Sequence, residues 1–129
     1  MARLAKWPID PTSSGVAELT QQQRAAVEAV GNVLVMAGAG TGKTHTLVER
    51  VLHFALRERN PVRLDRFLIV TFTEAAAAEL KRRLTEALTA RYEADLENAW
   101  LATQLANLDY ARIGTLHSYC LRLLMEHFH

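Results

Sequence analysis

Hydrophobic residues recur every three or four positions in several stretches of the chain, which is the spacing of an amphipathic helix. The strongest pattern follows residue 43, where an apolar stripe lies opposite a charged side. The stripe consists of Leu47, Val48, Val51, Leu52, Ala55 and Leu56, and the charged side of Glu49, Arg50 and Arg57. The Asn60-Pro61 pair ends this predicted helix, because proline cannot continue the backbone hydrogen bonds.

Four further helices are predicted from weaker or shorter patterns. One begins after Thr20, where Gln23 three residues later completes a capping box. Its apolar side consists of Ala26, Val27 and Val30. Residues 74–90 are rich in alanine and carry a leucine at every fourth position, at Leu80, Leu84 and Leu88. The remaining two helices are predicted over residues 92–105 and from residue 116 onward.

Three short runs of β-branched and apolar residues separate these helices and predict strands. They cover residues 32–37, 67–72 and 111–114. The first two runs lack the alternation of a half-buried strand and are typical of strands buried on both faces. Strands that alternate with helices predict an α/β fold, in which helical crossovers join parallel strands.

The composition narrows the class of protein. The 129 residues are 50% hydrophobic and 22% charged, which is too apolar for a disordered tail. No apolar run is long enough to cross a membrane, so no membrane partner is expected. The formal net charge of +1 argues against a protein that binds nucleic acid by overall basicity. With Cys120 as the single cysteine and no apolar signal-peptide core near residue 1, the expected location is cytoplasmic.

Residues 37–44 read AGAGTGKT and lie between a predicted strand and a helix, which is the context of a phosphate-binding loop. The predicted nucleotide-binding residues are Ala37, Gly38, Ala39, Gly40, Thr41, Gly42, Lys43 and Thr44. The three glycines allow positive φ angles and a close approach of the backbone N–H groups to phosphate. Lys43 would supply a charge for the β- and γ-phosphates, and the Thr44 hydroxyl would be a ligand of Mg²⁺. These two are the candidate catalytic residues, and ATP and Mg²⁺ the expected cofactors.

The loop departs from the strict pattern at one position, since Ala37 stands where the pattern has glycine. An ordinary glycine-rich turn between a strand and a helix is the alternative interpretation. That alternative does not explain the Lys-Thr pair directly after the last glycine, so phosphate binding is favoured.

Three other segments carry motifs in a fixed order around the loop. LTQQQRAAV precedes it by one helix, VTFTEAAAAELKRRL starts at the end of the second predicted strand, and IGTLHSYCLRLL at the end of the third. Together with the loop, these motifs resemble the N-terminal motor domain of the UvrD/Rep-type DNA helicases, and they look most like the RecB/AddA helicase-nuclease branch. The resemblance covers about residues 19–128. It implies a partial P-loop (RecA-like) three-layer sandwich with a short parallel sheet.

The resemblance assigns Gln23 to the adenine edge of the nucleotide, because an amide can donate and accept hydrogen bonds at once. The capping box with Thr20 accounts for a glutamine at this position equally well. Both roles stay open at the level of the sequence.

By the same resemblance, the ends of two strands contact single-stranded DNA, through Thr71, Phe72, Thr73, Thr115 and His117. Phe72 would stack on a base, while hydroxyls and helix N-terminal amides would hold phosphates. In the alternative interpretation, Phe72 belongs to the core, Thr73 and Thr115 are helix N-caps, and His117 packs in a first helical turn. Glu74 occupies a position where the family often has asparagine, and its carboxylate would repel phosphate, so no DNA contact is assigned to it.

Several parts of a complete motor of this class are missing from the sequence. The 129 residues contain no Asp-Glu pair to hold Mg²⁺ and activate the attacking water, and no second motor domain to supply arginines. No nuclease cluster of carboxylates and lysine is present either. We therefore expect a flexible leader over residues 1–18, and over residues 19–129 the N-terminal part of an ATP-binding helicase motor domain, truncated before the Asp-Glu strand.

The expected function is that of the ATP-binding N-terminal fragment of an ATP-dependent DNA helicase, with or without a nuclease, in recombination and repair. Its expected partners are single-stranded DNA, the rest of the parent helicase and, in the helicase-nuclease branch, a partner subunit. Two other functions stay open. A stand-alone, non-catalytic nucleotide- or DNA-binding regulatory module would have a native stop codon after His129. An unrelated P-loop ATPase or kinase would have no affinity for single-stranded DNA.

Overall fold

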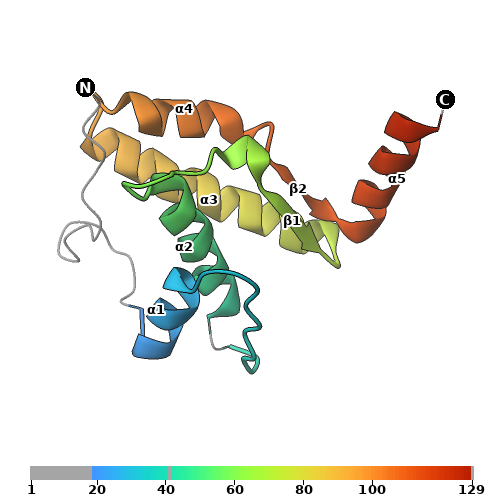
Figure 1. The fold of residues 1–129 in the computed structure, drawn as a ribbon, viewed down its shortest axis with the longest axis horizontal. Helices are drawn as coiled ribbons and strands as arrows, with labels where there is room; N and C mark the ends of the chain where they lie inside the picture. The colour runs from blue at the N-terminus through green and yellow to red at the C-terminus, as the bar shows by residue number, and fades with distance from the viewer. Residues whose placement is uncertain (1–18, 41, 129) are drawn as a thin grey trace.

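The computed structural model describes residues 19–40 and 42–128, so the predicted leader over residues 1–18 lies outside the described residues. Within them, the elements in chain order are α1 (Gln21–Glu28), α2 (Lys43–Leu56), the 3-10 helix η1 (Leu64–Arg66), β1 (Leu68–Thr71), α3 (Glu74–Ala94), α4 (Ala99–Leu108), β2 (Arg112–Thr115) and α5 (Leu116–His127). Figure 1 shows α3 in the middle of the molecule, with α4 along one side of it and α2 on the other. The two strands lie near the end of α3 where α3 begins.

The sheet consists of β1 and β2, which run parallel. Leu68 lies opposite Arg112 at one end of the pair, and Thr71 lies opposite Thr115 at the other. The connection between the strands contains α3 and α4, as parallel strands require. The predicted α/β class and the short parallel sheet are therefore confirmed, as are the second and third predicted strands to within one residue at each end.

The strand predicted over residues 32–37 does not form in the described part of the chain. Its hydrophobic side chains are exposed rather than buried, with Val33 at 40%, Leu34 at 86%, Val35 at 48% and Met36 at 88%. An apolar run becomes a strand only when a neighbouring strand accepts its backbone hydrogen bonds, and here β1 pairs with β2 alone. The described residues therefore form a two-stranded sheet and not the predicted three-layer sandwich.

The core forms around the leucine stripe of α3. Leu80, Leu84 and Leu88 repeat every four residues and are 2%, 0% and 0% exposed. They pack against the apolar stripe of α2, against η1 and β1, and against α4. The residues on these partners are Val48, Val51, Leu52, Ala55, Leu56, Leu64, Ile69, Leu101 and Leu108. The predicted stripes of both helices are confirmed, except that Leu47 stays 38% exposed.

The boundary between α3 and α4 lies later than the sequence pattern predicts. α3 continues through residue 94, and Tyr92 packs against the core instead of starting a new helix. The break comes at Asn98, whose side-chain oxygen accepts a hydrogen bond from the Leu101 amide at 3.2 Å and caps α4. No helix-breaking residue lies near residue 91, so the leucine stripe carries the helix past the predicted end.

The first helix is also shorter than predicted, since α1 ends at Glu28 and only Val27 of its apolar side is buried. Val30 is 83% exposed. The backbone leaves the helix at Ala29, and its last carbonyl groups are bonded to an arginine of α2 instead of continuing the helix.

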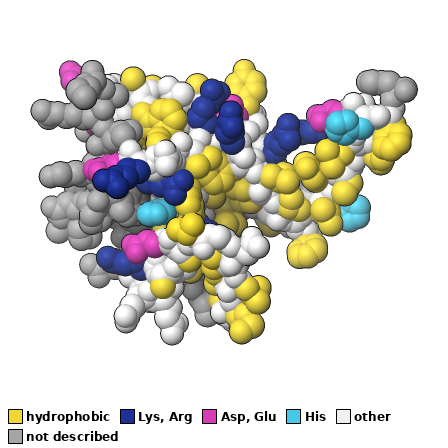
Figure 2. Space-filling view, viewed as in Figure 1, with side chains coloured by type: hydrophobic (Ala, Val, Ile, Leu, Met, Phe, Trp, Pro, Cys, Tyr) yellow, Lys and Arg dark blue, Asp and Glu magenta, His cyan; other side chains and the backbone are white. Residues whose placement is uncertain are grey.

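α5 packs only lightly on the rest of the molecule. Figure 1 shows it projecting away from the helical body, and none of its residues is buried. Hydrophobic side chains gather along this end of the chain in Figure 2. On α5, Leu121 is 59% and Met125 65% exposed, and Phe128 directly after it is 77% exposed. The predicted amphipathic helix is present, but its apolar side faces solvent. Of the helices described, none combines the length and the apolar character needed to cross a membrane.

An ion pair joins α2 to α3 inside the core region. Glu49 is 4% exposed, and its Oε2 lies 3.4 Å from Nη2 of Arg91. Burial lowers the pKa of Arg91 from its ordinary value, and the neighbouring Glu49 opposes that shift. The sequence pattern predicts Glu49 on a charged outer side, and this prediction is wrong because Arg91 comes from another helix and compensates the buried charge.

Removing one partner of this pair should destabilise the fold strongly, because the other charge would stay buried and unpaired. We expect Glu49→Ala to lower the free energy of unfolding by about 3–5 kcal/mol in urea denaturation. The double substitution Glu49→Leu with Arg91→Met should cost much less. The matched control is Asp109→Ala, which breaks the exposed Lys81–Asp109 pair and should cost at most about 1 kcal/mol. Equal losses for Glu49→Ala and Asp109→Ala would contradict this account.

Candidate functional site

The glycine-rich loop leads directly into α2, which begins at Lys43. Gly40 and Gly42 have φ angles of 75° and 77°, in the left-handed region that glycine adopts without a steric cost. Gly38 does not have a positive φ angle. The positive φ angles that the sequence predicts for all three glycines are therefore found at two of them, Gly40 and Gly42. Thr41 lies outside the described residues.

The start of α2 presents polar groups to the loop. Gly42 is the N-cap and provides no side chain to accept a hydrogen bond from the first turn. The ammonium group of Lys43 donates to the carbonyl of Ala37 at 2.9 Å, so this side chain folds back over the loop. Thr44 is exposed next to it. The amides of a first helical turn, the helix dipole and a lysine together favour an anion at this place.

Gln23 lies beside this loop although it is far from Gly42 in the sequence. A Cβ atom added to Gly42 would lie 3.0 Å from Nε2 of Gln23, so the glutamine amide packs against the last glycine of the loop. Its Oε1 accepts a hydrogen bond from the Thr20 amide at 2.9 Å, and the Gln23 amide donates to Oγ1 of Thr20 at 3.2 Å. The predicted capping box is therefore confirmed. The same side chain also faces the loop that is predicted to hold the nucleotide.

The strand ends form a second polar region, where Thr71 and Thr115 lie opposite each other across the sheet. Oγ1 of Thr73 accepts from the Ala76 amide at 3.1 Å and caps α3. Oγ1 of Thr115 accepts from the Ser118 amide at 3.2 Å and caps α5. The N-cap interpretation of both threonines is thus confirmed, and two helix N-termini begin side by side where the strands end.

Phe72 and His117 project from these strand ends into solvent. Phe72 is 96% exposed, so the interpretation that it belongs to the core is wrong. His117 is exposed in the first turn of α5 and is not packed there. A fully exposed phenylalanine at a polar edge has no role in packing the described residues, and it is available to contact a ligand.

Glu74 ties the two strand ends together. Its Oε1 accepts hydrogen bonds from the hydroxyl of Thr115 at 3.1 Å and from the hydroxyl of Ser118 at 3.0 Å. The Thr115 and Ser118 hydroxyl oxygens lie 2.9 Å apart, and Oγ1 of Thr71 lies 3.4 Å from the Gly114 carbonyl in the next strand. A carboxylate only accepts hydrogen bonds, so it is well suited to two hydroxyl donors at once. The sequence motifs assign Glu74 no role, because its partners lie more than 40 residues further along the chain.

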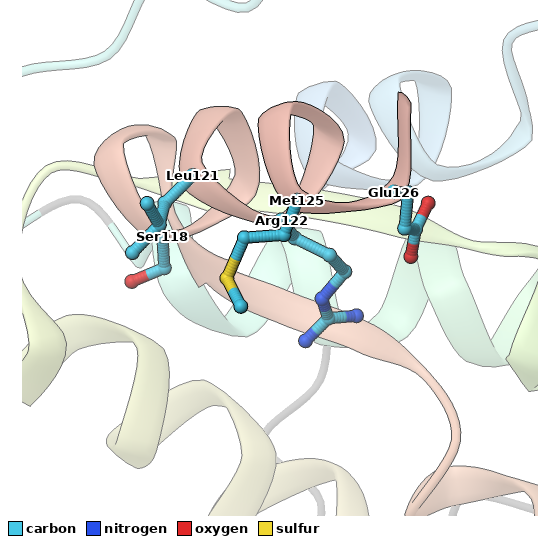
Figure 3. A pocket seen from close by; sticks show the side chains of 5 residues that line it. All are labelled: Ser118, Leu121, Arg122, Met125 and Glu126. Carbon is cyan, nitrogen blue, oxygen red and sulfur yellow. The ribbon is translucent and has the colours of Figure 1, made fainter. Parts of the chain in front are cut away.

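Two open hollows flank this edge, and Arg122 lines both of them. Figure 3 shows the first, along α5, with the side chains of Ser118, Leu121, Arg122, Met125 and Glu126. The second lies between α5 and the strands and also includes Arg112. Neither arginine is singled out by the motifs; Arg122 lies in the second turn of α5, after the strand ends, whereas Arg112 begins β2 at the opposite end of the strand pair. The position of Arg122 beside Ser118 could have been predicted from the sequence, because residues four apart lie on the same side of a helix.

The cationic cluster on α3 is, by contrast, already paired. Arg82 and Arg83 both donate to the carboxylate of Glu79, and these hydrogen bonds lower the pKa of Glu79 to about 2. Lys81 lies 3.1 Å from the carboxylate of Asp109. This side of α3 is a solvated surface that neutralises its own charge.

A glycine-rich loop with a Lys-Thr pair directly before a helix, in an α/β fold with parallel strands, has the sequence pattern of a P-loop protein. Comparison with family models gives the particular family. Residues 19–129 match the model described as the UvrD/REP helicase N-terminal domain, and the chain belongs to this family.

Curated relatives agree with this assignment, and three proteins named as subunits of an ATP-dependent helicase/nuclease illustrate it. The protein of Thermoanaerobacter sp. (strain X514) is 46% identical over 110 residues, covering 84% of this chain and 9% of the relative. The protein of Moorella thermoacetica is 46% identical over 119 residues, which are 92% of this chain and 8% of the relative. The protein of Bacillus cytotoxicus is 42% identical over 124 residues, which are 95% of this chain and 10% of the relative. The predicted resemblance to the helicase-nuclease branch is confirmed, and the chain spans about a tenth of the length of these relatives.

The hydrogen bonds of Glu74 give a prediction for the strand-end region. We expect Glu74→Ala to lower the free energy of unfolding by about 1 kcal/mol, because two hydroxyl groups lose their acceptor. Glu74→Gln keeps a side-chain carbonyl in the same place and should lose less than half as much in the same urea titration. Glu97→Ala, a change at an exposed glutamate on the turn before α4, is the matched control. If Glu74→Gln is as unstable as Glu74→Ala, the hydrogen bonds do not explain the role of this residue.

Proposed function

We propose that residues 37–44 bind Mg·ATP and that this chain is the ATP-binding N-terminal part of an ATP-dependent DNA helicase. In the parent protein, ATP hydrolysis would drive movement along single-stranded DNA in recombination and repair. The observation that carries the proposal is the placement of Lys43, the two left-handed glycines and Gln23 around the start of one helix. Membership of the UvrD/REP family supports it and argues against an unrelated P-loop ATPase or kinase.

The residues around the loop fit a magnesium nucleotide. ATP would supply the phosphoryl group whose transfer to water releases the free energy for movement. The Lys43 ammonium has three donors and now uses one on the Ala37 carbonyl, so it can turn to phosphate oxygens at small cost. The exposed Thr44 hydroxyl is the candidate ligand of Mg²⁺, a cation that prefers oxygen donors. Gln23 would contact the adenine edge from its place beside Gly42.

The strand-end region is the proposed contact with single-stranded DNA. Phe72 offers an exposed ring on which a base can stack, and the N-termini of α3 and α5 favour phosphate groups. The hydroxyls of Thr73 and Thr115 are used as helix caps, so in this proposal they orient the amides of those first turns. Thr71 and His117 complete the proposed DNA-binding set. The net charge of +1 is consistent with DNA contact through local groups and not through overall basicity.

The parent protein would supply what the described residues lack. The exposed side chains of residues 33–36 would become a strand of a RecA-like sandwich when neighbouring strands are present. The relatives are named as subunits of a helicase/nuclease, so we propose a partner subunit for the parent of this chain as well. The single cysteine, Cys120, supports the proposal of a cytoplasmic location.

The first test is nucleotide binding by the chain itself. We expect weak binding of a fluorescent ATP analogue with Mg²⁺, and Lys43→Ala should weaken it about tenfold to a hundredfold through the loss of charge-assisted hydrogen bonds. Lys81→Ala removes another lysine, on α3, and should leave the dissociation constant unchanged. Equal affinities of the wild type and Lys43→Ala would contradict the assignment of the loop.

The chain alone should hydrolyse essentially no ATP, because its sequence contains no Asp-Glu pair to activate water. Phosphate release in the presence of oligo-dT should stay at the background rate. Release that is stimulated by single-stranded DNA and abolished by Lys43→Ala would contradict this expectation.

The second test concerns DNA. We expect Phe72→Ala to weaken the binding of a fluorescent oligo-dT about 5- to 150-fold at one fixed salt concentration, which corresponds to the loss of one stacked base. Tyr110 is 75% exposed on a turn before β2, so Tyr110→Ala is the matched control for the loss of an exposed aromatic ring. Equal affinities of Phe72→Ala and the wild type would exclude base stacking at this edge.

A further inference from the structure

Arg50 joins α1 to α2 through an unusual set of contacts. Its Nη1 atom donates to the carbonyl groups of Ala26 at 2.6 Å, Val27 at 3.3 Å and Ala29 at 2.8 Å. These carbonyls belong to the C-terminal end of α1, where a helix has no backbone donors of its own. The guanidinium charge also faces the negative end of the helix dipole.

α1 has little else to hold it in place. It has eight residues, fewer than an isolated helix needs for stability in water, and Val27 is its one buried residue. Its main contact within the described part of the chain is with α2. Arg50 itself is held by Phe54, whose ring centroid lies 5.0 Å from its Cζ atom. Besides the Gln23 side chain beside Gly42, the buried Val27 and the hydrogen bonds of Arg50 are therefore the main contacts that hold α1 against α2.

The other end of the same two helices carries the nucleotide residues. Arg50 lies seven residues after Lys43, which is two helical turns, so both side chains leave α2 on about the same side. Gln23 lies in the first turn of α1, and its Nε2 atom is beside Gly42 at the start of α2. An arginine that fixes the C-terminal end of α1 therefore also fixes where the Gln23 amide lies relative to the phosphate-binding loop.

We propose that Arg50 is a positioning residue that sets the preference of this site for adenine by holding α1, and with it Gln23, against α2. The inference rests on the proposed nucleotide site. Arg50 does not touch the nucleotide in this proposal, and it contributes nothing to the phosphate contacts of Lys43. Its loss should thus change the discrimination between bases and leave the binding of the phosphates unchanged.

The experiment compares the affinities of the full chain for fluorescent ATP and GTP analogues, and its inhibition by inorganic tripolyphosphate. Arg50→Met keeps an apolar stem of similar length without the donors. We expect it to lower the ratio of ATP to GTP affinity about threefold to tenfold, the effect of losing about one positioned hydrogen bond, and to leave tripolyphosphate inhibition unchanged. In the Gln23→Ala background, Arg50→Met should have no further effect on the ratio.

Arg57→Met is the matched control. Arg57 also stacks on Phe54, with its Cζ atom 4.8 Å from the ring centroid, but it donates to the Asn60 carbonyl and not to α1. The base preference of this variant should equal that of the wild type. As a second readout, amide hydrogen exchange in α1 should accelerate in Arg50→Met while exchange in α3 stays unchanged.

Each outcome decides between the two proposals. An unchanged ratio in Arg50→Met, while Gln23→Ala lowers it, would overturn the role of Arg50. An equal loss of ATP and tripolyphosphate binding in Arg50→Met would overturn it too, because it would indicate general damage to the site. A wild type with no preference for ATP would remove the basis of the inference, and insensitivity of tripolyphosphate binding to Lys43→Ala would instead refute the proposed nucleotide site.

Discussion

The packing of the leucine stripe of α3 is the contact on which the rest of the molecule depends. Leu80, Leu84 and Leu88 are fully or almost fully buried, and α2, α4 and both strands pack against the helix that carries them. The same helix begins directly after β1, so its N-terminus is fixed at the strand ends. One apolar stripe thereby places α2, the helix that follows the proposed phosphate-binding loop, on one side and the proposed DNA edge at one end.

Three sets of polar contacts then fix the positions of neighbouring helices relative to one another. Glu49 and Arg91 join α2 to α3 inside the core region, and Glu74 joins the start of α3 to the start of α5. Arg50 joins α1 to α2. Each of these contacts connects segments at least 20 residues apart, and each joins a charged group to a partner that it meets only in the folded chain. The proposed nucleotide site and the proposed DNA edge are thus both held by hydrogen bonds to charged side chains.

The sequence predicts the features that depend on local periodicity and on motifs. The stripes of α2 and α3 and the capping box of Thr20 and Gln23 follow from residue spacing, and the two parallel strands follow from short apolar runs between helices. The helicase family follows from the resemblance of the ordered motifs to known members. The features that it misses depend on partners far along the chain. Residues 32–37 have the composition of a strand but no neighbouring strand in the described residues, and Glu49 is charged but buried because Arg91 lies on another helix. The contacts of Glu74 and Arg50 are not predicted for the same reason. The hydroxyl donors of Glu74 and the carbonyl acceptors of Arg50 belong to other elements of the fold.

The central claim is that the loop between α1 and α2 is a nucleotide site assembled from both helices. Its most direct test is an NMR titration of the ¹⁵N-labelled chain with Mg·ADP, which reads every backbone amide separately. We predict that the largest shift changes occur at Gly40, Gly42, Lys43 and Thr44, with a smaller change at Gln23 and none along α4. Shift changes confined to α5 or spread evenly over the chain, with none in the loop, would contradict it.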